Sequence, residues 1–478
     1  MAKNITPRSQ NYSQWYLDVI KAGQLADYGP VKGCMVIRPS GFAIWEAIQA
    51  QLDRMFKESG HVNAYFPLLI PQHFLEKEAE HVEGFSPECA VVTHGGGKEL
   101  EEPLVVRPTS ETVIGHMYAQ WINSYRDLPV LINQWCNVMR WEMRTRLFLR
   151  TSEFLWQEGH TAHETYEQAQ EETMKILEIY RKFQEDYLAI PVIKGKKTES
   201  EKFPGADATY AVEALMQDGK ALQAATSHNL KQNFAKAFEI QFLGRNNERE
   251  YVYTTSWGCS TRMIGGLIMS HSDDDGLILP PKIAPIAVAI LPIFKNDAEK
   301  SKTIEFAESI AQRLSEHLDP LRVKIDDREM RPADKFFHWV QQGIPVRIEV
   351  GPRDVDKGAG MVARRDIRDK RSIPVDSIVD TVVQMLEDIQ NNLYQRALQF
   401  REENTTTVKS YGEFKQVLSE KGGFIRAHWN GSAEVEEKVK EETKATIRCI
   451  PSDEEPLAGK CIFTGEPSPQ EVLFAVSY

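Results

Sequence analysis

Three blocks of the sequence combine arginine, glutamate, threonine and glycine at spacings that suit the handling of phosphate groups. They are residues 107–111 (RPTSE), residues 139–160 (MRWEMRTRLFLRTSEFLWQEGH) and residues 257–266 (WGCSTRMIGG). A further short block, QAATSH at residues 223–228, lies between the last two. Arg140 and Glu142 are two residues apart, so on a strand both side chains would face the same side of the sheet.

The residue types in these blocks indicate what they could bind. A guanidinium at Arg140 can hold a phosphate or carboxylate through two hydrogen bonds, and Glu142 can hold an amine, the edge of an amide-like ring or Mg²⁺. The Phe154 ring can stack on a planar base, and Arg262 beside glycines can approach a phosphate. Such a set needs no activated nucleophile, so it suits phosphoryl chemistry driven by positioning and charge. The chain has neither GxxxxGKS/T nor GxGxxG, which argues against P-loop and Rossmann sites.

Each of these residues also has a purely structural interpretation. Arg140 and Glu142 could form a surface ion pair, and Phe154 and Trp156 could be core residues of a strand. His160 and His163 could be a metal pair, although no cysteine partners them. His228 could cap a loop. The order and joint occurrence of the blocks carry the functional interpretation.

The elements that must position these blocks follow from hydrophobic periodicity. Residues 64–70 (AYFPLLI) read as an edge or interface strand because they contain a proline. Further elements are expected as helices over residues 40–57, 110–125 and 164–187 and strands over residues 130–135 and 148–158. Strands in runs without regular βαβ alternation favour an antiparallel sheet flanked by helices, an α+β domain, through residue 279.

The rhythm changes after Pro280-Pro281. Alternation of strands and helices predicts a mixed or parallel α/β sheet of about 110 residues. Its elements are expected as strands over residues 286–291, 323–325, 346–350 and 361–363 and helices over residues 298–314, 332–342 and 377–400. From about residue 405 a third, highly charged region runs to the end. Residues 471–478 are apolar for a tail, so we expect them to be packed.

Composition bounds the class of protein. The 478 residues are 42% hydrophobic and 26% charged, which is typical of a folded protein of two or three domains. The formal net charge of −12 excludes general attraction to nucleic acid, so a nucleic-acid partner would need a local basic patch. The six cysteines form no CxxC pair, which favours a reducing, cytoplasmic location over a disulfide framework. We see no signal peptide and no membrane span.

Taken together, the blocks resemble those of class II aminoacyl-tRNA synthetases, and specifically prolyl-tRNA synthetases of the archaeal/eukaryote-like type. The stretch from Gly60 through YFPLL at residues 65–69 resembles the first class II signature, which builds the dimer interface in the family. Arg140 to Phe154 resembles the second signature and Gly258 to Arg262 the third. RPTSE, WQEGH at residues 156–160 and TSH at residues 226–228 are the features that indicate proline. The resemblance covers almost the whole chain.

The resemblance implies a role for each matching residue. Arg140 and Arg262 would be catalytic. The proline-binding residues would be Thr109, Glu111, Arg140 and His228, with Glu111 opposite the secondary ammonium. The ATP-binding residues would be Arg140, Glu142, Arg150, Thr151, Phe154, Gln223, Thr226, Ser260 and Arg262. Gln223 would also lie near Mg²⁺, and Ser260 stands where the family more often has threonine.

The resemblance also implies the reaction and the partners. L-proline would be activated by ATP to prolyl-adenylate with release of pyrophosphate, and then transferred to the 3′ end of tRNA(Pro), in a homodimer with Mg²⁺ as cofactor. No editing domain in cis is expected, because the interval from His160 to Trp257 is too short for one. The alternative is a synthetase-like protein that binds an amino acid and ATP for regulation. That alternative is weakened because the signature arginines are retained.

The resemblance implies three domains: a class II catalytic domain at residues 1–282, an anticodon-binding α/β domain at residues 283–402, and a small α+β C-terminal domain at residues 403–478. Relatives often bind structural zinc through four cysteines in the last domain. The corresponding positions here are Asn430, Val435, Cys461 and Thr464. One thiolate cannot build the four-coordinate site that zinc prefers, so we expect no zinc, the rival being a site completed by His428 and neighbouring acids.

The second domain contains a candidate basic patch. Residues 353–371 carry seven Lys/Arg against four Asp. Arg364, Arg365 and Arg368 lie in this stretch, which is predicted to face the tRNA anticodon arm. The alternative is a solvated charged loop.

Overall fold

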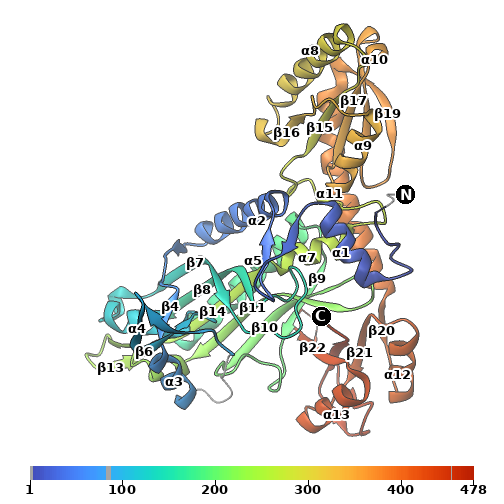
Figure 1. Cartoon of the computed structure of the whole chain (residues 1–478). Helices are drawn as coiled ribbons and strands as arrows, with labels where there is room; N and C mark the ends of the chain where they lie inside the picture. The colour runs from blue at the N-terminus through green and yellow to red at the C-terminus, as the bar shows by residue number, and fades with distance from the viewer. Residues whose placement is uncertain (1–3, 82–87, 454) are drawn as a thin grey trace.

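The computed structural model describes residues 4–81, 88–453 and 455–478. Its largest element is an eleven-stranded sheet, in which strands from the C-terminal end of the sequence continue the sheet formed by strands of the first 260 residues (Figure 1). In spatial order the strands are β20 (Thr405–Thr407), β21 (Phe424–His428), β25 (Glu471–Ala475), β22 (Thr446–Pro451), β9 (Val192–Lys196), β10 (Ala208–Leu215), β11 (Ala221–Lys231), β14 (Tyr253–Ser260), β8 (Glu153–His163), β7 (Val130–Met139) and β3 (Val62–Asn63). All neighbours are antiparallel except the outermost pair at each edge.

Helices pack against this sheet through their apolar stripes. They are α1 (Tyr12–Ala22), α2 (Pro39–Glu58), α5 (Tyr166–Lys182) and α7 (Arg262–His271). In α2, Ile44, Ile48 and Leu52 recur at helical spacing and are almost fully buried in one core with Trp257 of β14. Burying an apolar side chain of this size contributes about 2 kcal/mol. The helix predicted over residues 40–57 is therefore confirmed.

A second, smaller core lies on the side of β7. It is formed by Phe66, Ile114, Tyr118 and Phe234 among others. The elements around it are β4 (Leu69–Pro71), α3 (Gln72–His81), β5 (Val91–Gly95), β6 (Lys98–Val106), α4 (Glu111–Trp121), α6 (Asn233–Ala237), β12 (Gln241–Leu243) and β13 (Arg249–Tyr251). A short hairpin of β1 (Ala26–Tyr28) and β2 (Met35–Ile37) completes the N-terminal part.

The alternation beyond Pro281 forms a separate mixed sheet, as predicted. Its order is β16 (Val323–Ile325), β15 (Val288–Pro292), β17 (Val346–Val350), β18 (Ala359–Arg364) and β19 (Lys370–Pro374), with the first two pairings parallel and the last two antiparallel. The associated helices are α8 (Asp297–Leu314), α9 (Pro332–Gln341), α10 (Pro352–Asp356) and α11 (Val375–Glu403). Figure 1 shows α11 running from this five-stranded unit past the large sheet toward the C-terminal strands.

The residues after α11 form a C-terminal unit that includes α12 (Tyr411–Glu420), α13 (Ala433–Thr443) and the short strands β23 (Gly459–Lys460) and β24 (Pro467–Ser468). Val472, Leu473 and Phe474 are at most 1% exposed. The apolar tail is therefore packed, as the sequence indicated. The six cysteines all lie in the described ranges, and no disulfide joins any of them.

Three local predictions were wrong. Residues 64–68 are not a strand but connect β3 to β4. The strand expected from residue 148 begins only at Glu153, because Phe148 takes a left-handed turn with φ of 61°. Arg140 and Glu142 lie beyond the end of β7, so they do not share a strand face. No helix in the described part of the chain is both long and apolar enough to span a membrane.

Candidate active site

A cavity of about 360 Å³ opens on the central strands of the large sheet. The predicted residues that line it are Thr109, Glu111, Arg140, Phe154, Gln223, Thr226, His228, Ser260 and Arg262. Four blocks separated by up to 150 residues thus meet at one site. The reason is the strand order, which places β10, β11, β14, β8 and β7 side by side.

Strand β8 supplies one wall of the cavity. Phe154, Trp156, Glu158 and His160 are each two residues apart on this strand, and all four line the cavity. Gly159 lies between the last two, and a Cβ there would come within 2.1 Å of the Trp257 ring of β14. Glycine therefore lets the neighbouring strands pack closely behind this wall.

Two arginines bring positive charge into the cavity. Arg140 donates from Nε to the carbonyl oxygen of Pro108 at 3.0 Å and lies 5.7 Å from the Phe154 ring centre and 5.3 Å from that of Trp156. Arg262, the first residue of α7, donates from Nε to the carbonyl oxygen of Leu149 at 3.1 Å. Backbone carbonyls thus fix both guanidiniums, and within the described ranges neither forms an ion pair with a carboxylate.

Burial affects these two groups in the same direction. The pKa of Arg262 is lowered to about 10. Burial is the main cause, and the nearby positive charges of Arg150 and Arg140 act in the same direction. Burial also lowers the pKa of Arg140, which the carboxylates of Glu111 and Glu158 raise in part. Both groups stay cationic at neutral pH, and a bound anion would relieve their mutual repulsion.

Glu111, the first residue of α4, lies in the same cavity as a buried carboxylate. It accepts a hydrogen bond from the hydroxyl of Thr109. On the adjacent wall, His160 Nε2 lies 3.0 Å from Glu158 Oε2. Although burial raises the pKa of Glu158, hydrogen bonds from His160, Ser110 and Gln134 lower it overall, to about 2. Burial lowers the pKa of His160, but Glu158 and the charge of Glu111 raise it overall.

His228 is neutral by contrast. Burial lowers its pKa to about 3, and the charge of His160 acts in the same direction. Its Nδ1 lies 2.9 Å from the hydroxyl of Thr209, and the Phe203 ring is 4.8 Å from its own ring. The site therefore places an acidic group, a neutral imidazole and an aromatic wall around a space suited to a small ammonium-bearing ring.

Possible metal donors in the cavity are Glu111, Glu158 and His160, whose ligand atoms lie within 4.8 Å of one another. Because Glu158 and His160 already bond each other, the arrangement suits an ammonium group better than a metal ion. The alternative of a His160–His163 metal pair fails, because the two residues are three apart on a strand and face opposite sides. His163 instead bonds the hydroxyl of Thr161 at 2.7 Å.

Three predicted ATP residues lie outside the cavity wall. Glu142 and Arg150 form an ion pair at 2.6 Å between Oε2 and Nε in the loop between β7 and β8. Thr151 is buried and donates from its hydroxyl to the carbonyl oxygen of Glu153 at 2.7 Å.

Other lining residues were missed by sequence reasoning. Glu158 was noted only within the WQEGH block and His160 only there and as half of a possible metal pair, although their alternation on a strand with Phe154 and Trp156 could have indicated a shared face. Lys197, Glu201, Lys202, Phe203 and Pro204 also line the cavity, and no motif marks them.

The three arginines of the predicted basic patch form ion pairs within the protein. Arg365 is buried, and its guanidinium lies 2.6 and 2.9 Å from the two carboxylate oxygens of Asp273, in the loop after α7. Arg364 forms a two-bonded pair with Asp366 at 2.8 and 3.0 Å. Arg368 is exposed but pairs with Asp273 at 3.4 Å and with Asp275. Arg365 and Arg368 thus fasten the unit to the loop at residues 273–276, whereas Arg364 is paired within its own unit.

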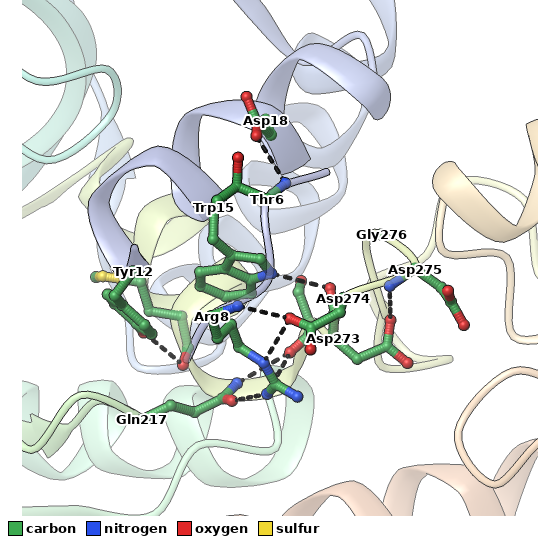
Figure 2. A network of polar contacts seen from close by, with 12 residues as sticks. Thr6, Arg8, Tyr12, Trp15, Asp18, Gln217, Asp273, Asp274, Asp275 and Gly276 are labelled. Atoms are coloured by element: carbon green, nitrogen blue, oxygen red, sulfur yellow. Dashed lines mark hydrogen bonds and ion pairs between the residues drawn. The ribbon is translucent and has the colours of Figure 1, made fainter. Parts of the chain in front are cut away.

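The N-terminal segment also holds this loop (Figure 2). Arg8 donates from Nε to Asp274 Oδ1 at 3.1 Å, and Trp15 donates from Nε1 to the carbonyl oxygen of Asp273 at 3.0 Å. The aspartates after α7 thus connect the N-terminal segment, the end of α7 and the five-stranded unit. The charges of Arg365 and Arg368 are therefore neutralised by aspartates within the protein.

A different face of the five-stranded unit has the features of a nucleobase site. A cavity of about 260 Å³ is lined by Lys335, Phe336, Phe337, Glu349 and Lys370 among others. Phe337 is 45% exposed, and the Arg347 guanidinium lies 4.0 Å from the centre of the Phe336 ring. Aromatic rings beside cationic groups are what unstacked RNA bases bind.

The C-terminal unit does not fit a zinc ion. Asn430 donates to Glu466 Oε2 at 2.6 Å, and the hydroxyl of Thr464 donates to the same oxygen at 3.1 Å. Cys461 is buried beside them, and Val435 has no donor atom. His428 lies 3.3 Å from the Ser468 hydroxyl through Nδ1 and 3.8 Å from Glu471 through Nε2. A tetrahedral zinc site needs four free ligands such as thiolates or imidazoles. This unit offers one thiol, and the hydroxyl, amide and carboxylate groups near it already bond each other.

The chain matches three family models along its length. They are the tRNA synthetase class II core domain (G, H, P, S and T) at residues 92–271, the anticodon binding domain at residues 287–385, and the prolyl-tRNA synthetase C-terminal domain at residues 411–478.

Similar curated proteins carry the name proline–tRNA ligase. Those of Chlorobium phaeovibrioides and Chlorobaculum tepidum are 59% and 58% identical, each over 100% of both chains. That of Roseiflexus is 56% identical over 100% of this chain and 99% of its own. A solved structure of prolyl-tRNA synthetase from Cryptosporidium parvum, complexed with halofuginone and AMPPNP, is 41% identical with a TM-score of 0.93 and covers 99% of each chain.

Proposed function

Since the chain belongs to the proline–tRNA ligases, a family of class II aminoacyl-tRNA synthetases, we propose how its cavity carries out proline activation. An enzyme of this family joins proline to tRNA in two steps, through prolyl-adenylate. The observation that carries the residue assignment is the placement of two guanidiniums, Arg140 and Arg262, in one cavity with the buried carboxylate of Glu111. The carboxylate of Glu111 can face the ammonium of proline, and the two guanidiniums can face the negatively charged groups of proline and ATP.

Proline binds at the acidic end. Its secondary ammonium faces Glu111, which Thr109 orients through its hydroxyl. The neutral His228 and the Phe203 ring border the pyrrolidine ring, and a neutral imidazole there avoids repelling the ammonium. The proline carboxylate then points toward Arg140, which can bridge it to the α-phosphate of ATP.

ATP binds at the cationic end. The adenine lies between the Phe154 ring and the Arg262 guanidinium, with Gln223, Thr226 and Ser260 around it. We assign Arg150 and Thr151 to the outer phosphates, because Arg150 is close enough to influence the pKa of Arg262, and Glu142, which pairs with Arg150, to the amine edge of ATP or to Mg²⁺. The amide oxygen of Gln223 is a ligand type that Mg²⁺ accepts together with phosphate oxygens. Bound Mg²⁺ would neutralise phosphate charge.

The chemistry requires charge stabilisation but no fixed protein base. A proline carboxylate oxygen attacks the α-phosphorus in line, a new P–O bond forms, and the bond to the β-phosphate oxygen breaks to release pyrophosphate. Arg140 and Arg262 stabilise the negative charge that grows on the α-phosphate oxygens. The tRNA 3′-terminal hydroxyl then forms an ester with the prolyl carbonyl, and the anhydride bond to AMP breaks.

The tRNA partner binds at a second place. We propose that the cavity beside Phe336 and Phe337 takes an anticodon base, since it offers stacking faces and charged hydrogen-bonding groups. Because charged tRNA is used by ribosomes, we place the enzyme in the cytoplasm. No hydrolytic editing domain in cis is proposed, and the subtype is the archaeal/eukaryote-like one, with domains at residues 1–282, 283–402 and 403–478.

A homodimer is proposed from an exposed apolar face. Val62 is 61% exposed, Tyr65 73% and Trp121 46%, around the stretch that resembles the first class II signature. Large apolar side chains gathered in this way mark protein–protein contact. Sedimentation or light scattering would report the mass of two chains, and a single chain at micromolar concentration would contradict the proposal.

Proline-dependent exchange of pyrophosphate into ATP tests the activation step. Exchange is expected with proline far above that with alanine, cysteine or threonine, and Arg140→Ala should abolish it. Glu111→Gln should raise the KM for proline by about 10- to 100-fold, because it removes a charged hydrogen-bond partner. Absence of exchange with all of these amino acids would overturn the assignment as an enzyme. It would favour the alternative of a synthetase-like protein that binds an amino acid and ATP for regulation.

A further inference from the structure

The loop that follows β9 forms one side of the proline end of the cavity. Lys197, Glu201, Lys202, Phe203 and Pro204 all line it. The backbone N–H of Phe203 donates to the hydroxyl of Thr209 at 2.9 Å, and this hydroxyl also contacts Nδ1 of His228. The position of the loop therefore decides where the Phe203 ring stands beside His228.

The C-terminal unit holds this loop from outside the cavity. Glu436, in α13, accepts a hydrogen bond from the hydroxyl of Thr198 at 2.9 Å. Lys440, one turn further along α13, lies 3.9 Å from Glu201. At the start of the loop, Lys197 donates from Nζ to the carbonyl oxygen of Arg448 at 2.6 Å. Because these contacts join the loop at residues 197–204 to α13 and β22, the conformation of the loop depends on docking of the C-terminal unit.

Glu436 is a residue type that a purely structural contact would not require. It is only 4% exposed, and a buried carboxylate destabilises a protein unless its hydrogen bonds compensate. An alanine or leucine would fill a helix–loop contact without that cost. What the carboxylate adds is directional: it accepts a hydrogen bond from the hydroxyl of Thr198, and a further one from the side chain of Ser200 in the same loop.

We propose that Glu436 is a positioning residue for amino-acid binding: by holding Thr198 it keeps the loop at residues 197–204, and with it Phe203, against His228 in the conformation that closes the proline pocket. The inference rests on the proposed function of the cavity. It assigns to the C-terminal unit a part in selecting the amino acid rather than in binding a metal. The ATP end of the cavity is not touched by this loop contact.

The test measures steady-state pyrophosphate exchange with the full-length chain at varied proline and at varied ATP. Glu436→Ala should raise the KM for proline by about tenfold through loss of a hydrogen bond to a charged group. The KM for ATP and the kcat should stay within about twofold, the ordinary range of neutral substitutions. Thr198→Val, which keeps the shape of the side chain, should give the same change. Glu436→Gln retains an acceptor oxygen and should restore proline binding.

A double variant separates positioning from general damage. Glu436→Ala with Thr198→Val should be no worse than Glu436→Ala alone, because the hydrogen bond that Thr198→Val removes is already lost when the carboxylate is gone. Lys438→Ala, on the same helix with a side chain 71% exposed, is the matched control and should behave as wild type. An unchanged KM for proline, additive effects, or an equal rise in both KM values would each overturn the inference. Absence of exchange in the wild type would instead overturn the proposed function.

Discussion

Arg448 of β22 and Glu213 of β10 form a buried ion pair in which Nε and one terminal nitrogen of the guanidinium each lie 3.1 Å from a carboxylate oxygen. Lys197 adds a third contact at 2.9 Å to the same carboxylate. Between the two strands, Gly195 of β9 has no side chain, and a Cβ there would lie 2.3 Å from the carbonyl oxygen of Ile450. The C-terminal unit is thus joined to the sheet that carries the active site by both backbone and charge.

Breaking this pair should destabilise the protein. Glu213 is 0% exposed, so Arg448→Met leaves a buried carboxylate with only Lys197 to compensate it. The expected loss is about 3 kcal/mol in the free energy of unfolding, measured by urea denaturation. Adding Glu213→Gln to Arg448→Met should recover a large part of that loss, because the unpaired charge is then gone. Equal stability of the wild type and Arg448→Met would contradict the interpretation.

Buried histidines should make the stability fall in mild acid. Burial lowers the pKa of His163 to about 4 and the pKa values of His228 and His271 to about 3, from an ordinary 6.5. Below pH 6.5 the unfolded chain therefore binds protons that the native chain does not, and stability decreases as the pH falls toward these native pKa values. Between pH 6 and pH 4.5 the slope should approach three protons, about 4 kcal/mol per pH unit.

Urea midpoints across this range would measure the slope. His160 has a raised pKa, so its contribution is present below pH 6.5 and is lost as the pH rises through its native value. It therefore cannot account for a loss in acid. His271→Asn should reduce the slope by one proton, whereas substitution of exposed His94 should leave it unchanged. A flat profile between pH 6 and pH 4.5 would show that these imidazoles are protonated in the native state.

The anticodon assignment predicts a separation of the two reaction steps. Phe337→Ala removes an exposed stacking face from the cavity of the five-stranded unit and should lower kcat/KM for tRNA by about 10- to 100-fold. Pyrophosphate exchange without tRNA should not change. Leu321→Ala is a control in the same unit, since Leu321 is 83% exposed and does not line the cavity. Equal effects of the two variants on charging would refute the assignment.

The sequence predicted the parts of the site that local pattern determines. Phe154 and Arg262 belong to short blocks with characteristic composition, and both line the cavity because their blocks lie on or beside neighbouring strands β8 and β14. The helix over residues 40–57 and the alternation after Pro281 were predictable for the same reason. Periodicity reports the face that an element buries, and that information is local.

What could not be predicted depends on partners distant in the sequence. Arg365 reads as a solvent-facing cation until its partner Asp273, 92 residues earlier, is placed beside it. Glu158 needs Ser110 and Gln134, which come from a helix terminus and from β7. The loop at residues 197–204 has no motif, because its shape is set by α13 and β22 rather than by its own residues. Composition cannot separate a charge that binds RNA from one that joins domains.

The C-terminal unit should keep its stability when metals are removed. At two of the positions that the resemblance matched to a zinc site, Asn430 and Thr464 both bond Glu466, so these side chains are already engaged in hydrogen bonds. Dialysis against a strong zinc chelator should leave the thermal midpoint unchanged, and the purified protein should contain well below one zinc per chain. Glu466→Ala removes both hydrogen bonds, and because the carboxylate is exposed it should cost about 1 kcal/mol, which for a protein of this size lowers the midpoint by about two degrees. Exposed Glu455→Ala is the matched control and should have no effect. A midpoint that falls with the chelator and returns with added zinc would show that Cys461 and its neighbours bind the metal after all.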